Sequence, residues 1–386
     1  MNTPVTLSPS NITLKNRLFK AAMAESMADS EGLPTPDYFK LYEHWGTVDN
    51  IITGHMMISP HAIAHAGDVI IQDTPQFRAS MRDFCENLPR SVLVAQINHP
   101  GRQISPDLMK TGKMRPVSPI PGPVLPGWPE PEQLTDEMYA EILAMFSSSA
   151  ALLLDCGFHG VNFHAAHGYL LSEVFHPDYF TQKRLDMFTE MVSKLREIYP
   201  NKILSAKMNL GDHYQLEHFK MLVDALEPYF DFVEISGGSY ADPKYMSKSP
   251  RHALFAEVVE KGLNTKKIML TGGFRSQEDF EKALTNATLV GVARPFAYED
   301  TVLDSIIAGR TLRSSRSLPT IFLIILTIWS FFTGNNFWPI INSSAKCRDE
   351  FKAIVDGAYE REPKFSYRES YEFTKKIILP SIKKSL

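Results

Sequence analysis

Two histidines and a tyrosine stand close together at the end of an apolar stretch in the middle of the chain. His164 and His167 are three residues apart, and Tyr169 follows two residues later. Imidazole N–H groups can donate hydrogen bonds to a carbonyl oxygen and stabilise negative charge that develops on it. A tyrosine is an acid of suitable strength for delivering a proton to a carbon atom. The alternatives are core histidines or a zinc pair, although no third zinc ligand of matching type is obvious nearby. We therefore treat these three residues as candidates for catalysis and substrate binding.

A second set of residues has the composition of a phosphate site. Gly272 and Gly273 follow one apolar run, and Ala293 and Arg294 follow the next, about twenty residues later. Glycine allows backbone N–H groups to approach a phosphate closely, and arginine supplies a matching fork of donors. One Gly-Gly pair alone is typical of an ordinary turn, and the alternative for the whole set is turns plus a surface arginine. Two such motifs after successive strands favour phosphate binding.

Two further polar residues interrupt apolar runs. Gln96 carries an amide that can donate to and accept from the pyrimidine edge of a flavin. Lys207 could place a cation beside the flavin N1–C2=O locus, where it would stabilise the anionic reduced flavin. Taken singly, either residue is more often structural. Together with the phosphate motifs they outline a binding site for a whole flavin.

The elements that must position these residues are short β-rich runs separated by helical stretches. We expect strands at Leu18–Met23, Asn50–Ile58, Val92–Asn98, Gly160–His164, Ile203–Met208, Asp231–Ser236, Lys267–Thr271 and Thr288–Ala293. The helical pattern is clearest at Thr135–Asp155, Arg184–Tyr199 and Ser276–Leu284. Pro116–Pro131 is expected to be a long loop after the third strand. Eight strands alternating with helices predict an α/β fold, a closed (β/α)8 TIM barrel with a C-terminal extension, whose active site lies at the carboxyl ends of the strands.

The chain changes character after residue 310. We expect residues 1–310 to form the FMN-binding barrel, residues 311–345 to be an apolar segment, and residues 346–386 to be a C-terminal helical extension. The apolar segment has several interpretations: a helix packed on the barrel or on a partner subunit, a membrane-associated segment, an unpacked tail, or sequence that is not part of a natural folded product. Gly334, Asn335, Asn336 and Pro339 interrupt the run before the roughly 20 apolar residues of a membrane span. Membrane contact is therefore not the favoured interpretation.

Composition argues against several classes of protein. The net charge of −4 gives no electrostatic reason to expect binding to nucleic acid. Three dispersed cysteines have no metal or iron–sulfur spacing and fit a reducing compartment. Residues 1–10 lack the pattern of a secretory signal, so a cytoplasmic location is expected. The expected partner is a small molecule, and the oligomeric state is not determined by the sequence.

In combination, these motifs resemble the Old Yellow Enzyme family of NADH:flavin oxidoreductases. The resemblance runs from about Leu14 to Gly309 and rests on Leu14–Arg17, Thr53-Gly54, Gln96–Gln103, His164–Leu170, Thr271–Arg275 and Gly291–Pro295. It implies that FMN takes a hydride from NADH or NADPH and passes it to the β-carbon of an α,β-unsaturated carbonyl compound or similar electrophile. By the same resemblance, His164 and His167 would hold the carbonyl oxygen, and Tyr169 would protonate the α-carbon.

The resemblance also implies positions for the flavin ring. The backbone of Ala22, Met23 and Ala24 would cover the ring, and His55 would lie near it. Members of the family often carry threonine or cysteine where Ala24 stands, which implies a shifted flavin potential. They usually carry Asn where His55 stands.

One departure from the family pattern leaves a second functional hypothesis open. About a dozen residues that usually follow the histidine motif are missing after Tyr179. A paralogue that binds FMN, is catalytically impaired and serves a binding or structural role therefore remains the alternative. A flavin barrel with an iron–sulfur cluster is excluded by the cysteine pattern. The histidine pair argues against a dihydroorotate-type site.

Overall fold

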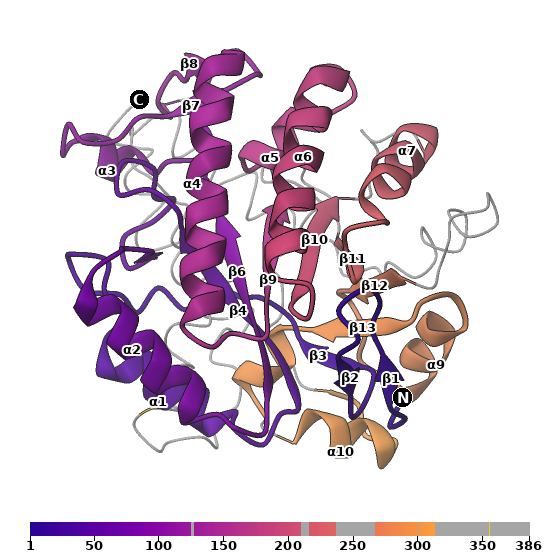
Figure 1. Ribbon diagram of the computed structural model, residues 1–386. Helices are drawn as coiled ribbons and strands as arrows, with labels where there is room; N and C mark the ends of the chain where they lie inside the picture. Colours follow the sequence, from indigo (N-terminus) through magenta and orange to yellow (C-terminus); the bar gives the residue numbers. More distant parts are fainter. Residues whose placement is uncertain (125–126, 210–215, 237–266, 300, 313–354, 356–386) are drawn as a thin grey trace, which may run out of the picture.

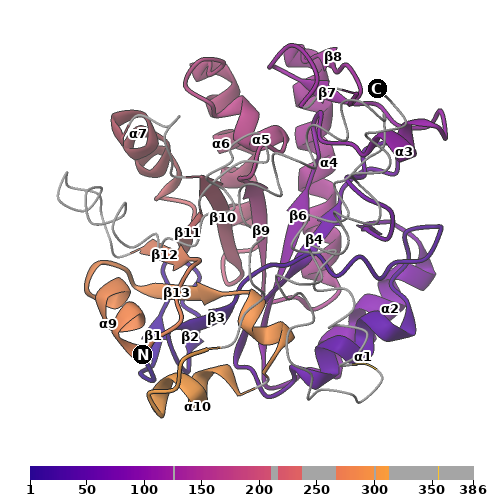
Figure 2. The same cartoon turned by 180° about the vertical axis from the view of Figure 1, so that it is seen from behind.

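Eight parallel strands close into a barrel surrounded by helices in the computed structural model (Figures 1 and 2), which describes residues 1–124, 127–209, 216–236, 267–299, 301–312 and 355. In chain order the barrel strands are β3 (Leu18–Lys20), β4 (Asn50–Met57), β6 (Val92–Asn98), β9 (Gly160–Ala165), β10 (Ile203–Asn209), β11 (Phe232–Ser236), β12 (Ile268–Thr271) and β13 (Leu289–Val292). A pairing of Lys20 with Ile51 joins β3 to β4 and completes the ring. The short strand β5 (Val69–Ile70) is added to β4.

All eight predicted strands are confirmed, with ends that shift by a few residues. The three predicted helices are confirmed as α4 (Asp136–Asp155), α6 (Gln182–Ile198) and α9 (Gln277–Asn286). Each begins after a side chain that caps it: the Thr135, Thr181 and Ser276 hydroxyls accept backbone N–H groups of the first turn. Within the described residues, the other helices are α1 (Pro36–His44), α2 (Pro75–Glu86), α3 (Pro106–Met109), α5 (Leu170–Val174), α7 (Leu216–Leu226), the 3-10 helix η3 (Arg294–Ala297) and α10 (Val302–Ile307).

The predicted Pro116–Pro131 loop contains one short strand. β7 (Val117–Ser118) pairs with β8 (Glu132–Gln133), which lies just beyond the predicted range. This pairing holds the two ends of the loop together. The apolar segment at 311–345 lies outside the described residues except for its first two positions, as does nearly all of 346–386. Within the described part of the chain, α4 is the one helix long and apolar enough to cross a membrane by length and composition. Its apolar face packs in the barrel's outer core, with Phe146 and Leu153 fully buried.

The inside of the barrel changes from apolar to polar along each strand. Near the amino ends of the strands, one buried cluster contains Phe19, Ile52, Val94, Ile203, Phe232, Met269 and Leu289. Successive inward side chains of a strand are two residues apart. Two residues beyond four members of this cluster stand Gln96, Ser205, Glu234 and Thr271, all buried. The carboxyl end of the barrel, which we call the mouth, is therefore lined with polar groups.

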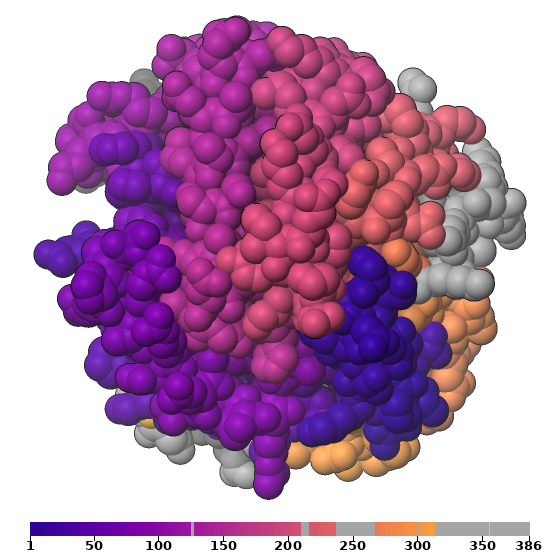
Figure 3. Space-filling model, viewed as in Figure 1, coloured from indigo at the N-terminus to yellow at the C-terminus, as the bar shows by residue number. Residues whose placement is uncertain are grey.

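The N-terminal residues close the opposite end of the barrel. Strands β1 (Val5–Thr6) and β2 (Thr13–Leu14) form an antiparallel pair, and Leu7 and Leu14 join the apolar cluster inside the barrel. In Figure 3 these indigo residues lie against pink and orange residues of the second half of the barrel. The amino end of the barrel is thus covered by the chain itself.

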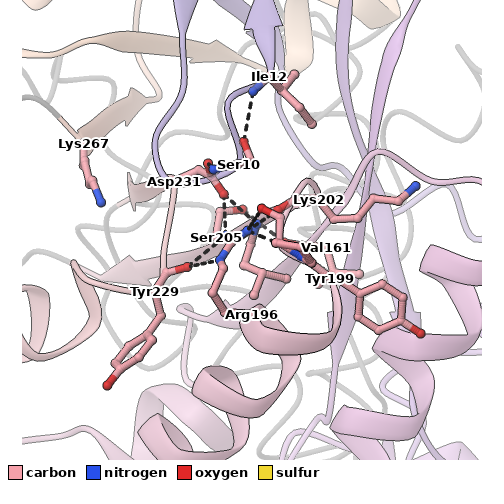
Figure 4. A network of polar contacts seen from close by, with 12 residues as sticks. Ser10, Ile12, Val161, Arg196, Tyr199, Lys202, Ser205, Tyr229, Asp231 and Lys267 are labelled. Carbon is pink, nitrogen blue, oxygen red and sulfur yellow. Dashed lines mark hydrogen bonds and ion pairs between the residues drawn. The ribbon is translucent and has the colours of Figure 1, made fainter.

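A buried ion pair fastens this N-terminal segment (Figure 4). Asp231 accepts the backbone N–H of Ser10 at 2.9 Å and that of Leu204 at 3.0 Å. The Nη2 atom of Arg196 donates to the same carboxylate at 2.7 Å. Arg196 also donates to backbone carbonyl oxygens, including that of Tyr229. A single carboxylate thus joins the N-terminal segment, β10 and helix α6.

Replacing Asp231 with Ala should lower the free energy of unfolding by roughly 3–5 kcal/mol, because it leaves a buried guanidinium without its counter-ion. The measurement is the urea unfolding midpoint. Glu190→Ala is the control, since the Glu190–Lys194 pair is an exposed ion pair on α6 and should contribute little. Equal losses in the two variants would show that the Asp231 network does not stabilise the barrel.

Candidate functional site

The candidate catalytic residues form one aromatic cluster at the mouth. The ring centroids of His164 and Tyr169 are 4.7 Å apart, and those of His164 and His167 are 5.2 Å apart. His55, from β4, joins them at 5.8 Å from His164 and 5.4 Å from Tyr169. The three residues chosen from their spacing are therefore adjacent in space, and a fourth ring lies beside them.

Backbone and side-chain hydrogen bonds hold His167 in an unusual conformation. Its φ is 64°, in the left-handed region that few residues other than glycine adopt. Its N–H donates to Asn209 at 3.0 Å, and its carbonyl accepts from the Gln103 amide at 2.9 Å. Its Nε2 lies 3.1 Å from the Ser236 hydroxyl. Contacts from three other segments thus fix the strained turn and the ring together.

The hydrogen bonding of His164 identifies the nitrogen that can donate. Its Nδ1 accepts the backbone N–H of Ala166 at 3.3 Å, so in the neutral ring the proton is on Nε2. Burial, together with the nearby His167, His55 and Lys207, holds the pKa of His164 well below its usual value. His164 is therefore neutral near pH 7 and can donate only through Nε2.

His55 faces a buried carboxylate. Its Nε2 lies 3.5 Å from Asp68 Oδ1, and its Nδ1 lies 3.4 Å from the Asn98 amide nitrogen. Burial raises the pKa of Asp68, but His55, His65 and backbone hydrogen bonding outweigh burial, and the net pKa is lowered. The family resemblance implied a position near the flavin for His55 but gave no sign of Asp68, which comes from the connection between β4 and β5.

Lys207 and Gln96 lie inside the mouth, as predicted, but both have protein partners. Lys207 Nζ is 3.0 Å from Glu234 Oε1, a fully buried carboxylate on the adjacent strand. The Gln96 amide nitrogen donates to Asn162 Oδ1 at 2.8 Å, and Asn162 in turn donates to Ser205 at 3.0 Å. The Gln96 carbonyl oxygen therefore remains for a ligand, and the charge of Lys207 is partly balanced.

The two glycines of the expected phosphate site have left-handed backbone. Gly272 and Gly273 have φ values of 112° and 84°, and a Cβ atom on Gly272 would meet nothing within 4 Å. Arg294 begins η3 directly after Ala293, at the end of β13. Burial and the nearby Arg294 lower the pKa of Arg275 to about 10. Two arginines close together beside an open glycine turn have the charge of an anion site, and Arg275 adds a group that we did not include among the predicted site residues.

Ala22, Met23 and Ala24 follow β3 at the same end of the barrel, with Met23 buried and both alanines partly exposed. The next residue, Glu25, is buried and accepts hydrogen bonds from Tyr42 and from the Gly54 N–H. A Cβ atom on Gly54 would lie 1.9 Å from Glu25 Oε2, so only glycine fits there. This contact fixes the β3 end against β4.

The loop after β6 supports the aromatic cluster from outside the barrel. Arg102 Nε donates to Glu173 Oε1 at 2.6 Å, and Ser118 donates to Oε2 at 2.8 Å. His99 accepts the Gly101 N–H on Nδ1, and its carbonyl accepts the Leu170 N–H at 3.1 Å. The same loop supplies the Gln103 amide that holds His167. Among the described residues, no group of three or more His, Cys, Asp or Glu side chains could hold a metal ion.

Comparisons with known proteins show the family to which the chain is related. The model of the NADH:flavin oxidoreductase / NADH oxidase family matches residues 2–189. The chain is 30% identical to the NADH-dependent flavin oxidoreductase nadA of Aspergillus parasiticus, over 90% of the chain and 88% of that protein. It is 27% identical to iliE of Hypocrea jecorina, another NADH-dependent flavin oxidoreductase, over 81% of the chain and 90% of that protein.

Solved structures show the same fold. The old yellow enzyme of Trypanosoma cruzi superposes with a TM-score of 0.65 at 16% identity, covering 82% of this chain and 93% of that one. A homologue from Zymomonas mobilis gives 0.66 at 17% identity, covering 81% and 94%. The predicted TIM barrel is thereby confirmed.

The buried His99 should make the site loop sensitive to acid. Burial lowers its folded-state pKa from 6.5 to about 3. Between these values the unfolded chain binds a proton that the folded chain does not, so stability falls as the pH falls through this window, by up to about 1.4 kcal/mol per pH unit.

His99→Asn retains an acceptor for the Gly101 N–H but has no titrating ring, so its urea midpoint should fall less steeply than that of the wild type below pH 6.5. The difference between the urea midpoints of the two proteins at pH 7.5 measures the effect of the changed packing, and it is subtracted from the differences at lower pH. Parallel pH curves for the two proteins would contradict the assignment.

Proposed function

The chain belongs to the NADH:flavin oxidoreductase / NADH oxidase family and is a flavin-dependent oxidoreductase, and on that basis we propose that it uses FMN and NADH or NADPH to reduce the activated C=C bond of an α,β-unsaturated carbonyl compound. The observation that carries this proposal is the cluster of His164, His167 and Tyr169 at the mouth. When bound, FMN would supply hydride transfer from the nicotinamide to the β-carbon.

The residues of the mouth fit FMN in two respects. The open Gly272 turn beside Arg275 and Arg294 offers backbone N–H groups and two cations to a phosphate dianion. The Thr271 hydroxyl, buried without a hydrogen-bond partner in the described structure, lies at the start of the same turn. Gln96 would meet the pyrimidine edge of the flavin through its carbonyl oxygen. Lys207 would face the N1–C2=O locus with a charge that Glu234 moderates.

The histidines would bind and polarise the substrate. His164 Nε2–H is a neutral donor with its other nitrogen already occupied, so its orientation is fixed before the substrate arrives. His167 would be the second donor to the carbonyl oxygen, held by its contacts with Asn209 and Gln103. Donors fixed in advance stabilise the enolate charge without reorganisation. Tyr169 would then donate its proton to the α-carbon.

In this proposal the partner of the protein is a small-molecule electrophile. The proposed location of the protein is the cytoplasm. The net charge of −4 offers no attraction to nucleic acid. The proteins nadA and iliE, which the chain resembles over most of their length, are named as NADH-dependent. This favours NADH as the first hydride donor to test.

The phosphate assignment predicts that Arg275→Ala and Arg294→Ala each weaken FMN binding about 10- to 100-fold, because each removes a charge-assisted contact. FMN fluorescence during titration of the apoprotein measures the affinity. Riboflavin, which lacks the phosphate, should bind equally to all variants. Arg82→Ala, on the exposed face of α2, is the matched control. Equal loss of FMN and riboflavin affinity would refute a phosphate role.

The catalytic assignment predicts that Tyr169→Phe slows reoxidation of the reduced enzyme by 2-cyclohexenone about 100-fold or more, without slowing reduction by NADH. Anaerobic stopped-flow absorbance at the flavin band separates the two steps. The double variant His164→Ala/His167→Ala should retain FMN but lose the long-wavelength charge-transfer band that a phenol induces. An unchanged band would overturn the histidine roles. Wild-type protein that takes up FMN but is not reoxidised by the enone would favour the catalytically impaired alternative.

A further inference from the structure

Strand β4 contains a β-bulge where it approaches the mouth. Ile52 of β4 is paired with Val94 of β6. The next pair along the register is His55 with Gln96, so β4 advances by one residue more than β6 between the two pairs. Residues 53–54 therefore share a single opposite position on β6. Bulges of this kind occur next to active sites, where they change the direction of a side chain.

The bulge directs His55 into the mouth. Ile52 belongs to the apolar cluster inside the barrel. His55 stands three residues further along, and in a regular strand its side chain would point to the outer face, because successive side chains alternate. The extra residue of the bulge restores the inward direction, and the His55 ring centroid lies 5.4 Å from that of Tyr169. The place of His55 beside the candidate catalytic residues thus depends on the bulge.

Side chains accept the backbone N–H groups at the bulge. The Gly54 N–H donates to Glu25 Oε1 at 2.8 Å, and the Tyr42 hydroxyl oxygen lies 2.9 Å from the same nitrogen. The Tyr42 hydroxyl in turn donates to Glu25 Oε1. On the neighbouring strand, the Gln96 N–H donates to the Thr53 hydroxyl at 3.2 Å. Buried backbone donors require such partners, so these side chains stabilise the irregular register.

Glu25 connects three elements at this point. It is buried and directly follows residues 22–24, which continue from β3. Its carboxylate contacts β4 at Gly54 and helix α1 at Tyr42. The lack of room for a Cβ atom on Gly54 shows that the carboxylate lies directly against the bulged backbone. The segment after β3 and the bulge of β4 are therefore held together by one side chain.

These two segments are the ones for which the family resemblance implies contact with the flavin ring. The backbone of residues 22–24 would cover the ring, and His55 would lie near it. A planar ligand held between two segments binds most tightly when their relative position is fixed before it arrives. A contact that joins the two segments would supply this fixed position.

We propose that Glu25 is a positioning residue for the flavin ring. By accepting the Gly54 N–H it holds the β4 bulge and joins residues 22–24 to it, so that this backbone and His55 are aligned before the flavin binds. The inference rests on the proposed function in that the ligand is FMN. The hydrogen bonds that hold the bulge can be tested without the flavin.

Three variants separate the acceptor from the charge of Glu25. Glu25→Leu removes the acceptor and leaves the donors of Gly54 and Tyr42 buried without it. Glu25→Gln keeps an Oε1 acceptor and removes the charge. Tyr42→Phe removes one hydroxyl and leaves the charge that Glu25 presents to the buried Lys20. Asp231→Asn is the matched control, because it changes another buried carboxylate in a hydrogen-bond network, at the opposite end of the barrel.

The first test is titration of the apoprotein with FMN and with riboflavin, followed by flavin fluorescence. Glu25→Leu should weaken binding of both flavins about 10- to 100-fold, because the arrangement that binds the ring becomes a minor one. Tyr42→Phe should weaken both about 3- to 10-fold, and Glu25→Gln by less than about threefold. Asp231→Asn should bind both flavins within about twofold of wild type, although its urea midpoint falls. Equal effects on FMN and riboflavin distinguish a contact with the ring from one with the phosphate.

The second test is the exchange rate of the Gly54 amide proton in the flavin-free protein, measured by NMR. Glu25→Leu should raise this rate about tenfold or more, and Glu25→Gln should raise it less. If the wild type binds neither flavin, the proposed function fails, and the exchange rates still decide whether Glu25 holds the bulge.

Four results would overturn the inference: wild-type affinity for both flavins in Glu25→Leu, a loss in Glu25→Gln as large as in Glu25→Leu, the same loss in Asp231→Asn, or a wild-type Gly54 exchange rate in Glu25→Leu. If Glu25→Leu does not fold, Tyr42→Phe decides, and unchanged affinity for both flavins in that variant is the contradicting result.

Discussion

The site depends on the alternation of side chains along strands that close into a parallel barrel. Every second residue of such a strand points inward, and all eight strands run in one direction. The apolar cluster that begins with Phe19 and Val94 therefore fills the amino end, and the residues two positions further along form the mouth. Gln96, Ser205 and Glu234 are buried for this reason, and burial obliges each to find a polar partner or to await a ligand.

Charge in the mouth is distributed in pairs. Lys207 faces Glu234, and His55 faces Asp68, while His164 stays neutral between them. A buried ammonium is stabilised by a carboxylate beside it, so the Lys207–Glu234 ion pair can be accommodated inside the barrel. Arg275 and Arg294 differ from these pairs, because two cations lie close together, an arrangement that favours binding of an anion.

Rigidity around the histidines comes both from barrel strands and from a loop outside the barrel wall. The loop after β6 supplies Gln103 to His167 and is itself held by Arg102 on Glu173. The left-handed backbone of His167 is held in place because Asn209 accepts its N–H and Gln103 donates to its carbonyl oxygen. The segment after Tyr179, which the family pattern suggests is shortened, leads directly into α6 through the Thr181 cap. The contacts to the histidine turn come from Gln103 and Asn209 and do not involve this segment.

The sequence by itself determined the eight strands, three helices and the placing of His164, His167, Tyr169, Gly272, Gly273 and Arg294 at strand ends. Periodicity, capping residues and motif spacing are local properties, and a strand's direction fixes which end carries its last residues. Only the tertiary structure paired His55 with Asp68, Lys207 with Glu234 and Arg275 with Arg294. These partners come from different strands or from connecting segments with no periodic pattern, so their proximity follows from the closure of the barrel and the register between strands. The protonation of each ring depends on such neighbours and on burial, which a chain read in one dimension does not contain.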